Sequence, residues 1–468
     1  MRKGIFVLLI IILATVCLVS CDKPSQGLEF TSNGDGTCYV SGIGECRDYD
    51  VVIPSRSPEG ERVVAIGEKA FSEVHAIDSV KIPYGVTEIG SYAFAYCNRL
   101  KTVELPRGLK TIGEYAFMHS DSIEEMDLKA GLESIGSHAF YGLDKLKEIK
   151  LPEGVKSIGF MAFNECTALA EVKLPRSLES IENHAFRGCE ALTEVALPKD
   201  LKVLGESAFS GCKGLTEITV PDGITVIQKG VFSGCASLRS VKMGRVTEIQ
   251  SNAFADCYNL AKIELPETLK IIGEAAFIHC GMSTRESEDG LKSLTVPSGV
   301  EVIGPRAFVQ CPFEVVDFGE ASVQIGQSAF GSCEWLKMVT LSENTRSIGK
   351  SAFANCSRLT AIIIPDGITA IDDYAFENCS GITEIILPGS VKSIGEGAFY
   401  SCYSLKKIYI PASLTEIANQ AFAVCWDLEA VYYGGDESEW VKISVGESGN
   451  DYFNEAKVHY NHDPYSEW

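Results

Sequence analysis

Apolar and polar positions recur along most of this chain in one short phrase. In one clear copy the apolar positions are Ala93, Phe94, Cys97, Leu100, Val103 and Leu105, followed by Pro106. The last apolar positions alternate with polar residues, which is typical of a short β-strand with one buried face, and the proline ends that strand. Leu109 and Ile112 predict a second extended piece. The next copy starts at Ala116-Phe117, where we expect a compact single turn of helix.

The phrase returns sixteen times, and a phenylalanine marks each copy. The sixteen residues are Phe71, Phe94, Phe117, Phe140, Phe163, Phe186, Phe209, Phe232, Phe254, Phe277, Phe308, Phe330, Phe353, Phe376, Phe399 and Phe422. Most are spaced 23 residues apart, two gaps are 22 residues, and one gap is 31 residues. A fixed period of this length is the signature of a repeat protein, in which each unit packs only on its neighbours. We therefore predict one elongated solenoid of stacked parallel strands, with the sixteen rings forming a continuous buried spine.

Cysteine occupies one slot of the phrase, three residues after the phenylalanine, in thirteen units. Val74, Ser120 and Leu143 fill the same slot in the other three units. A metal or redox site needs thiols that converge on one point, whereas one thiol per unit makes a parallel ladder. Because valine and leucine also occupy the slot, we interpret the cysteine there as a small buried hydrophobic residue.

Composition and charge narrow the possible partners. A hydrophobic content of 46% is ample for a folded core, while a formal net charge of -22 opposes binding to nucleic acid. The seven histidines do not fall in one slot on neighbouring units, and we find no glycine-rich phosphate loop, zinc-ligand spacing or nucleophile motif. The sequence therefore predicts no nucleic-acid partner, no catalytic residues, no metal site and no cofactor. An enzyme is the less favoured class.

The first residues have the pattern of an export signal. Two basic residues precede an apolar run over residues 5–19 that is too short to span a membrane comfortably. Leu18-Val19-Ser20-Cys21 resembles the lipobox of bacterial lipoproteins, in which the cysteine is acylated and becomes the mature N-terminus. We predict a lipoprotein signal peptide over residues 1–20, lipidation at Cys21 and a membrane anchor at the bacterial cell envelope or surface. The alternative is an uncleaved signal anchor in which Cys21 is an ordinary thiol.

Residues 21–62 precede the first full copy, and we predict that they form an N-terminal cap. Asn33-Gly34-Asp35-Gly36 is a strong turn signal between two strand-like runs, so we expect a β-hairpin here. A cap of this kind closes the open end of a stack. Cys38 and Cys46 are close enough in the sequence to form a disulfide after export, and two free thiols are the open alternative.

The consensus F-x-x-C-x-x-L-x-x-[IV]-x-[LI]-P-x-x-[VL]-x-x-I-G-x-x-A-F resembles the leucine-rich repeats of BspA-type bacterial surface proteins. The resemblance covers most of residues 63–433, and the ending from Tyr432 through Trp440 to Asn461 looks like the C-terminal cap of that family, placed here at residues 434–468. It implies a β-rich leucine-rich repeat solenoid of about sixteen repeats of 22–23 residues, with short helical turns, on the cell surface. Some members are adhesins for host proteins. A structural repeat transfers no catalytic residues.

Functional residues are expected where the copies differ. Positions eight and ten residues after the phenylalanine flank the buried centre of the strand and point outward together. The first of these two columns holds five successive glutamates: Glu125, Glu148, Glu171, Glu194 and Glu217. Like charges directly opposite in a sheet repel, so they require lysines, water and salt, a basic partner or a divalent cation to offset them. We take these glutamates as candidate partner-binding residues.

The second column becomes apolar near the C-terminus, at Ile363, Ile386, Tyr409 and Tyr432. Four exposed apolar side chains in consecutive units would form a patch of the kind that marks a contact surface. The alternative is that the C-terminal cap folds back over them and makes them core.

These patterns favour a lipid-anchored binding or adhesion protein that recognises a protein or glycan partner through the face of its strands. A passive envelope protein without a defined ligand is the alternative, and the oligomeric state is left open.

Overall fold

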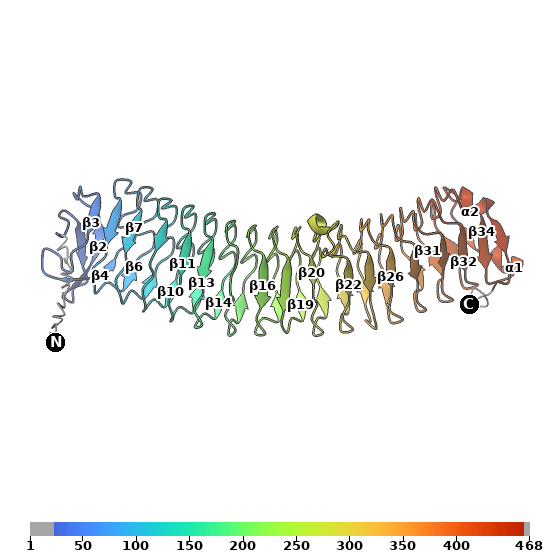
Figure 1. The fold of residues 1–468 in the computed structure, drawn as a ribbon, viewed down its shortest axis with the longest axis horizontal. Helices are drawn as coiled ribbons and strands as arrows, with labels where there is room; N and C mark the ends of the chain where they lie inside the picture. The colour runs from blue at the N-terminus through green and yellow to red at the C-terminus, as the bar shows by residue number, and fades with distance from the viewer. Residues whose placement is uncertain (1–22, 463–468) are drawn as a thin grey trace, which may run out of the picture.

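The computed structural model describes residues 23–462, which form one elongated and gently bowed solenoid (Figure 1). The predicted signal peptide and Cys21 lie outside the described residues. The N-terminal and C-terminal units lie at opposite ends of the rod, and backbone hydrogen bonds join each unit to the next. A leucine-rich repeat solenoid with very little helix is therefore confirmed.

Two rows of short strands make two sides of the solenoid. The first row comprises β3 (Asp50–Val52), β5 (Ser79–Lys81), β7 (Thr102–Glu104), β9 (Glu125–Met126), β11 (Glu148–Lys150), β13 (Glu171–Lys173), β16 (Glu217–Val220), β18 (Ser240–Met243), β20 (Lys262–Ile263), β22 (Ser293–Thr295), β24 (Val315–Asp317), β26 (Met338–Thr340), β28 (Ala361–Ile363), β30 (Glu384–Ile386), β32 (Lys407–Ile410), β34 (Ala430–Tyr433) and β36 (Lys457–His459). We call the outward surface of this row the strand face.

The second row is formed by the shorter extended segment of each unit. It comprises β4 (Arg62–Ile66), β6 (Glu88–Ile89), β8 (Thr111–Ile112), β10 (Ser134–Ile135), β12 (Ser157–Ile158), β14 (Ser180–Ile181), β15 (Val203–Leu204), β17 (Val226–Ile227), β19 (Glu248–Ile249), β21 (Ile271–Ile272), β23 (Val302–Ile303), β25 (Gln324–Ile325), β27 (Ser347–Ile348), β29 (Ala370–Ile371), β31 (Ser393–Ile394), β33 (Glu416–Ile417) and β35 (Ser444–Val445). Within both rows neighbouring strands pair in parallel through equivalent residues, as Ile149 does with Val172, and the ladders are interrupted at several points, such as between β20 and β22. The repeat period therefore sets the register.

The Ala-Phe segment closes each unit, but it is not the helical turn expected from the sequence. The amides of Tyr92, Phe94 and Tyr96 donate to carbonyls of the next unit at 2.9, 2.7 and 2.7 Å, and the amides between them bond to carbonyls three residues earlier. Tyr92 and Tyr96 have left-handed φ values of 56° and 59°. A helix cannot form, because alternate peptides bond along the solenoid axis. The described helices lie elsewhere: η1 (Met282–Thr284), α1 (Glu437–Trp440) and α2 (Asp451–Glu455).

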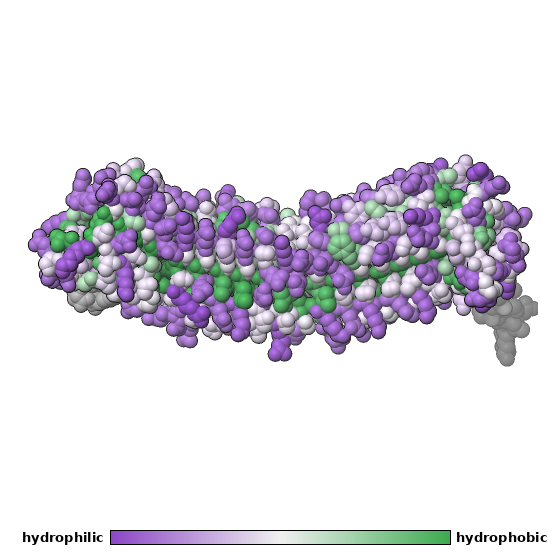
Figure 2. Space-filling view, turned by 180° about the vertical axis from the view of Figure 1, so that it is seen from behind, coloured by the Kyte–Doolittle hydropathy of each residue, from purple (hydrophilic) through white to green (hydrophobic). Residues whose placement is uncertain are grey.

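The predicted spine of aromatic rings runs through the core. All sixteen phenylalanines are at most 1% exposed. Neighbouring rings stack with centroids 5.0–6.0 Å apart and planes within 16° of parallel. On the face seen in Figure 2, hydrophobic side chains gather in a narrow band along the rod between hydrophilic margins. One ring per unit therefore forms a single continuous core.

Different local structures close the two ends of the stack. At the N-terminal end, β1 (Glu29–Ser32) and β2 (Thr37–Gly42) form the expected antiparallel hairpin, and β2 joins the second row beside β4. Cys38 and Cys46 are buried free thiols, which is the second of the two alternatives left open by the sequence. At the C-terminal end, β35 and β36 extend both rows, and Phe453 of α2 stacks on Phe422 at 4.7 Å.

Candidate interaction surfaces

The strand face holds the five candidate glutamates in one aligned column. Glu125, Glu148 and Glu171 are paired residue for residue across β9, β11 and β13, and Glu171 bridges to Glu194 of the next unit. Each glutamate is followed by a buried apolar residue of its strand, so its own side chain points outward. Four of the five are exposed and Glu171 is partly exposed. The structure thus brings these residues together on one surface.

A lysine neutralises this column at one point. Lys173 Nζ lies 2.8 Å from Glu171 Oε1, and the hydrogen bond to that carboxylate raises the pKa of Lys173. Within residues 23–462, Glu125, Glu148, Glu194 and Glu217 form no ion pair. An exposed ion pair contributes at most about 1 kcal/mol, and the carboxylates repeat at roughly 4.8 Å, the spacing of paired strands. Most of the negative charge of the column therefore faces solvent.

Two of the hollows over this column are lined between them by all five glutamates. The larger, of about 910 Å³, extends from β13 to β18 and is lined by Glu171, Glu194 and Glu217. The smaller, of about 480 Å³, extends from β7 to β13 and is lined by Glu125, Glu148 and Glu171. Glu171 and Lys173 line both hollows, so the two hollows are neighbours on the strand face, and lysines such as Lys150 and Lys242 line them beside the carboxylates.

The apolar column near the C-terminus is covered progressively toward the end of the stack. Ile363 is 80% exposed, Ile386 is partly buried, and Tyr409 is only 8% exposed. Tyr409 and Tyr432 stack at 4.7 Å, and two histidines of the C-terminal segment pack against these rings. The cap therefore covers Tyr409 and partly covers Tyr432, so at these two positions the second of the two alternatives left open by the sequence holds, whereas Ile363 stays exposed.

A second exposed apolar residue lies beside Ile363 on the strand face. Met338 is 46% exposed, and its strand β26 pairs with β28, which places Met338 opposite Ala361 and Thr340 opposite Ile363. Sequence reasoning missed Met338 because it followed the apolar residues of the second column only. The exposed apolar surface is therefore centred on Met338 and Ile363, nearer the middle of the rod than predicted.

The thiols of the cysteine ladder donate hydrogen bonds to backbone carbonyls. Cys212 Sγ lies 3.2 Å from the Phe186 carbonyl oxygen of the preceding unit, and all thirteen cysteines make this contact at 3.0–3.4 Å. Ser120 makes the same contact with the Phe94 carbonyl at 2.6 Å. Burial raises the pKa of the thiols, to about 12 at Cys97. The burial of these cysteine side chains was predicted correctly. The slot also favours a hydrogen-bond donor, and the presence of Ser120 in the slot was the sequence signal for that preference.

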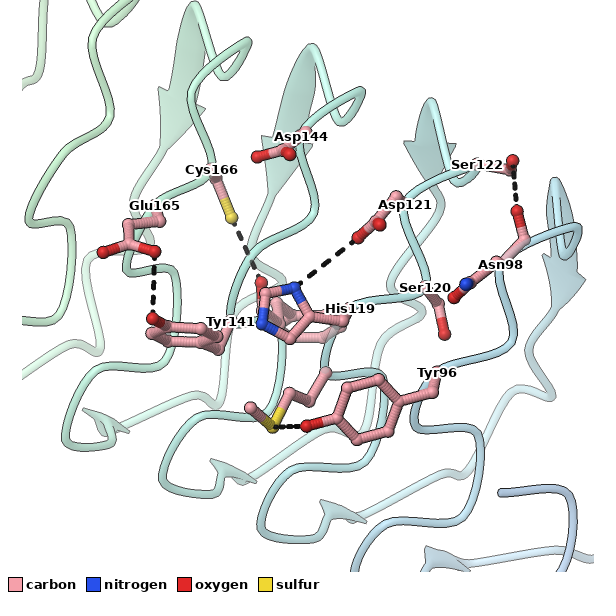
Figure 3. A network of polar contacts seen from close by, with 12 residues as sticks. Tyr96, Asn98, His119, Ser120, Asp121, Ser122, Tyr141, Asp144, Glu165 and Cys166 are labelled. Atoms are coloured by element: carbon pink, nitrogen blue, oxygen red, sulfur yellow. Dashed lines mark hydrogen bonds and ion pairs between the residues drawn. The ribbon is translucent and has the colours of Figure 1, made fainter. Parts of the chain in front are cut away.

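Aromatic and polar side chains gather on the Ala-Phe side of the N-terminal units (Figure 3). His119 Nδ1 lies 3.7 Å from Asp121 Oδ1, and the Tyr141 hydroxyl donates to Glu165 Oε2 at 2.9 Å. Burial raises the pKa of Asp121, and the neighbouring His119 opposes that shift. The His119–Asp121 contact lies within one unit, whereas the Tyr141–Glu165 bond joins neighbouring units, so we interpret this network as a structural link between units.

A column of stacked rings continues this surface. The rings of Tyr92, Tyr115 and His138 stack with centroids 4.6 and 4.4 Å apart. Each of these residues occupies the slot two residues before the phenylalanine of its unit. His184 occupies the same slot two units after His138. Burial lowers the pKa of both His138 and His184. The sequence analysis examined the histidines only as catalytic candidates and missed this column.

Within residues 23–462, no three histidine, cysteine, aspartate or glutamate side chains are arranged to hold a metal ion. In the same range no helix has the length and apolar character needed to cross a membrane.

The stacked parallel strands and the outward columns define a leucine-rich repeat solenoid with an acidic strand face. The family model of the BspA type leucine rich repeat region (6 copies) matches residues 64–193, 157–284 and 301–429, which is well over half of the sequence. The chain belongs to this BspA-type leucine-rich repeat family, as the resemblance of its consensus implied.

Solved structures include similar solenoids. A leucine-rich repeat protein from Bacteroides ovatus is 27% identical over 94% of this chain and 99% of its own, with a TM-score of 0.66. A leucine rich cell surface protein from Faecalibacterium prausnitzii is 26% identical over 90% of this chain and 98% of its own, with a TM-score of 0.39. A comparison with curated proteins found no match.

Proposed function

We propose that this chain is a cell-surface binding protein whose strand face docks a partner protein with a basic surface. The observation that carries the proposal is the column of five aligned glutamates along two neighbouring hollows, of which one glutamate is paired with a lysine. A row of like charges costs free energy unless counter-charges approach it. A basic partner supplies those charges, whereas an uncharged glycan, the other ligand class considered, gains nothing from them.

The exposed apolar residues at the other half of the strand face support the same proposal. Interfaces combine charged groups, which steer encounter and set register, with a few apolar residues that supply most of the affinity. Met338 and Ile363 are exposed on the same row of strands as the glutamates. The negative charge of the glutamates would attract a partner lying along the strand face. The bound partner would then bury the exposed side chains of Met338 and Ile363.

A charge-neutralising variant tests this proposal. Glu148→Gln, Glu171→Gln and Glu194→Gln combined remove three charges from the column without removing its side chains. The matched control is Glu88→Gln, Glu343→Gln and Glu416→Gln, which removes the same charge from exposed positions away from the strand face.

The assay is affinity capture of surface proteins by the mature protein, compared across wild type, column variant and control at low and high salt. We expect a saturable partner that the control retains and the column variant loses, with salt weakening the wild-type complex. Equal capture by all three proteins would refute the strand face as the site. Absence of any saturable partner would favour the passive envelope role.

We also propose that acylation of Cys21 anchors the protein at the cell surface. The support is the lipobox-like Leu18-Val19-Ser20-Cys21 after a short apolar run. In cells grown with a labelled fatty acid, the wild-type chain should carry the label and fractionate with membranes. Cys21→Ser should lose the label, and a labelled Cys21→Ser protein would refute the assignment.

A further inference from the structure

Two exposed aromatic side chains form a pair near the C-terminal end of the rod. Tyr403 and Trp426 each lie four residues after the phenylalanine of their unit, just before the strand-face row. Their ring centroids are 4.9 Å apart, with planes tilted by 35°, and they are 38% and 62% exposed. Stacked rings elsewhere in the core are shielded from water, so this pair exposes aromatic surface that the fold itself does not need.

The chain shows elsewhere which group packs on such rings. The guanidinium of Arg358 lies 3.9 Å from the ring centroid of Trp335, and both residues lie five residues after the phenylalanines of adjacent units. Arg99 lies over Tyr49 at 5.6 Å near the N-terminal end. In total four lysine or arginine side chains lie over aromatic rings within the described residues. Cations therefore pack over aromatic rings at several places on the surface of this fold.

Trp426 has the ring but not the cation. Within residues 23–462 no basic side chain lies over Trp426, which has Tyr403 as its ring neighbour. Two exposed carboxylates, Asp427 and Glu429, follow it in the chain, and neither forms an ion pair in the described structure. An open indole, followed one and three residues later in the chain by unpaired carboxylates, is complementary to a positively charged side chain with an apolar stem.

We propose that the Tyr403–Trp426 pair is a docking site for an arginine side chain of a partner protein. The stem and guanidinium of the arginine pack on the open surface of Trp426, as Arg358 packs on Trp335 within this chain, and Asp427 and Glu429 complement its charge. Arginine is favoured over lysine because its planar group stacks on aromatic faces and is more weakly hydrated. The site is separate from the glutamate column and does not depend on the function proposed for it.

The test uses the mature protein and a fluorescently labelled peptide of alternating arginine and glycine. Its matched peptide carries citrulline, which keeps the planar shape but not the charge. The variant is Trp426→Ala, and the control is Tyr84→Ala, which removes another exposed aromatic residue, 84% exposed, at the opposite end of the rod. Circular dichroism checks that both variants keep the wild-type fold.

Fluorescence anisotropy at about 0.15 M salt, where distant charges are screened, reports the peptide affinity. We expect Trp426→Ala to weaken binding of the arginine peptide roughly fivefold, the effect of one exposed cation–π contact, and Tyr84→Ala to leave it unchanged. The citrulline peptide should not distinguish wild type from Trp426→Ala. Equal affinity of wild type and Trp426→Ala for the arginine peptide would overturn the proposal.

Two additional measurements distinguish the arginine site from a sugar platform and from binding at the glutamate column. Binding of an uncharged glycan such as mannan that depends on Trp426, without an effect on the arginine peptide, would identify a sugar platform and refute the arginine site. When Trp426→Ala is added to the column variant Glu148→Gln, Glu171→Gln, Glu194→Gln, the affinity for the arginine peptide should again fall fivefold. Loss of that fivefold effect would mean that the peptide binds the glutamate column, which also contradicts the proposal.

Discussion

The cysteine slot offers the sharpest test of the packing, because two interpretations of it predict opposite orders of stability. Cys212 Sγ donates to the Phe186 carbonyl at 3.2 Å from a fully buried position. If the slot required only a small apolar side chain, Cys212→Ala would be at least as stable as Cys212→Ser, because serine would bury an unpaired hydroxyl at a cost of about 1–3 kcal/mol. If the slot uses a donor, serine should be the better replacement.

The structure supports the donor interpretation and gives the magnitude. Ser120 already occupies the slot in one unit, with its hydroxyl 2.6 Å from the Phe94 carbonyl. A hydrogen bond of this kind stabilises a protein by about 0.5–1.5 kcal/mol, so we expect Cys212→Ser to be more stable than Cys212→Ala by that amount. Alanine also leaves a small void where the sulfur was.

Urea unfolding followed by circular dichroism measures the difference, with Ser120→Ala as the internal control. Ser120→Ala removes the same donor and also the acceptor of the Cys97 amide, 3.1 Å away, so its cost should be about 1–3 kcal/mol. The reasoning is refuted if Cys212→Ala is as stable as Cys212→Ser, or if Ser120→Ala has no effect on the unfolding midpoint.

Three other outcomes follow from the same contacts. Phe254 lies in the middle of the stack, with neighbouring ring centroids at 5.4 and 5.1 Å. Phe254→Ala should lower the free energy of unfolding in urea by about 3–5 kcal/mol, and by more than Phe71→Ala at the end of the ring column. Equal losses in the two variants would contradict the stacked core. Burial lowers the pKa of His138 and His184 below 6.5, so below that pH the unfolded chain binds more protons than the folded one. Thermal stability should thus be full above pH 6.5 and fall as the pH drops toward the folded-state pKa, and His138→Phe with His184→Phe should flatten this dependence. Asn450→Ala removes the carbonyl that accepts from the Phe422 amide at 3.1 Å, and should cost about 1–3 kcal/mol and admit protease to the C-terminal segment earlier than in wild type.

The repeat made most of the architecture predictable. Once the period is known, the equivalent residues of adjacent units must pair, so the parallel register and the spine from Phe71 to Phe422 follow from spacing alone. The prediction of a helical turn at the Ala-Phe segment was wrong for a physical reason. Local spacing around Phe94 suits a turn of helix, but the amides of Tyr92 and Phe94 bond to the next unit, and a local pattern cannot reveal that competition.

The candidate surfaces were predictable only where the repeat fixes the direction of a side chain. The outward positions of Glu125 to Glu217 follow from strand alternation and are found as expected. The burial of Tyr409 depends on where a non-repeating segment folds, and no period determines that. The exposed pair Tyr403 and Trp426 lies outside the two strand columns, so a search limited to strands could not find it.

The Ala-Phe side shows how the same scaffold tolerates variation at its surface. Its ladder requires left-handed backbone at the slot two residues before each phenylalanine, where Gly230 and Gly397 sit without strain. In the N-terminal units the slot holds Tyr92, Tyr115 and His138 instead, and a side chain in this conformation costs about 1 kcal/mol or more. Stacking of the rings at 4.6 and 4.4 Å returns about 0.5–1.5 kcal/mol per pair. The free-energy cost of the strained backbone and the gain from ring stacking nearly cancel. An outward residue in this fold can therefore change with little effect on the core, and the surface of each unit is open to selection for binding.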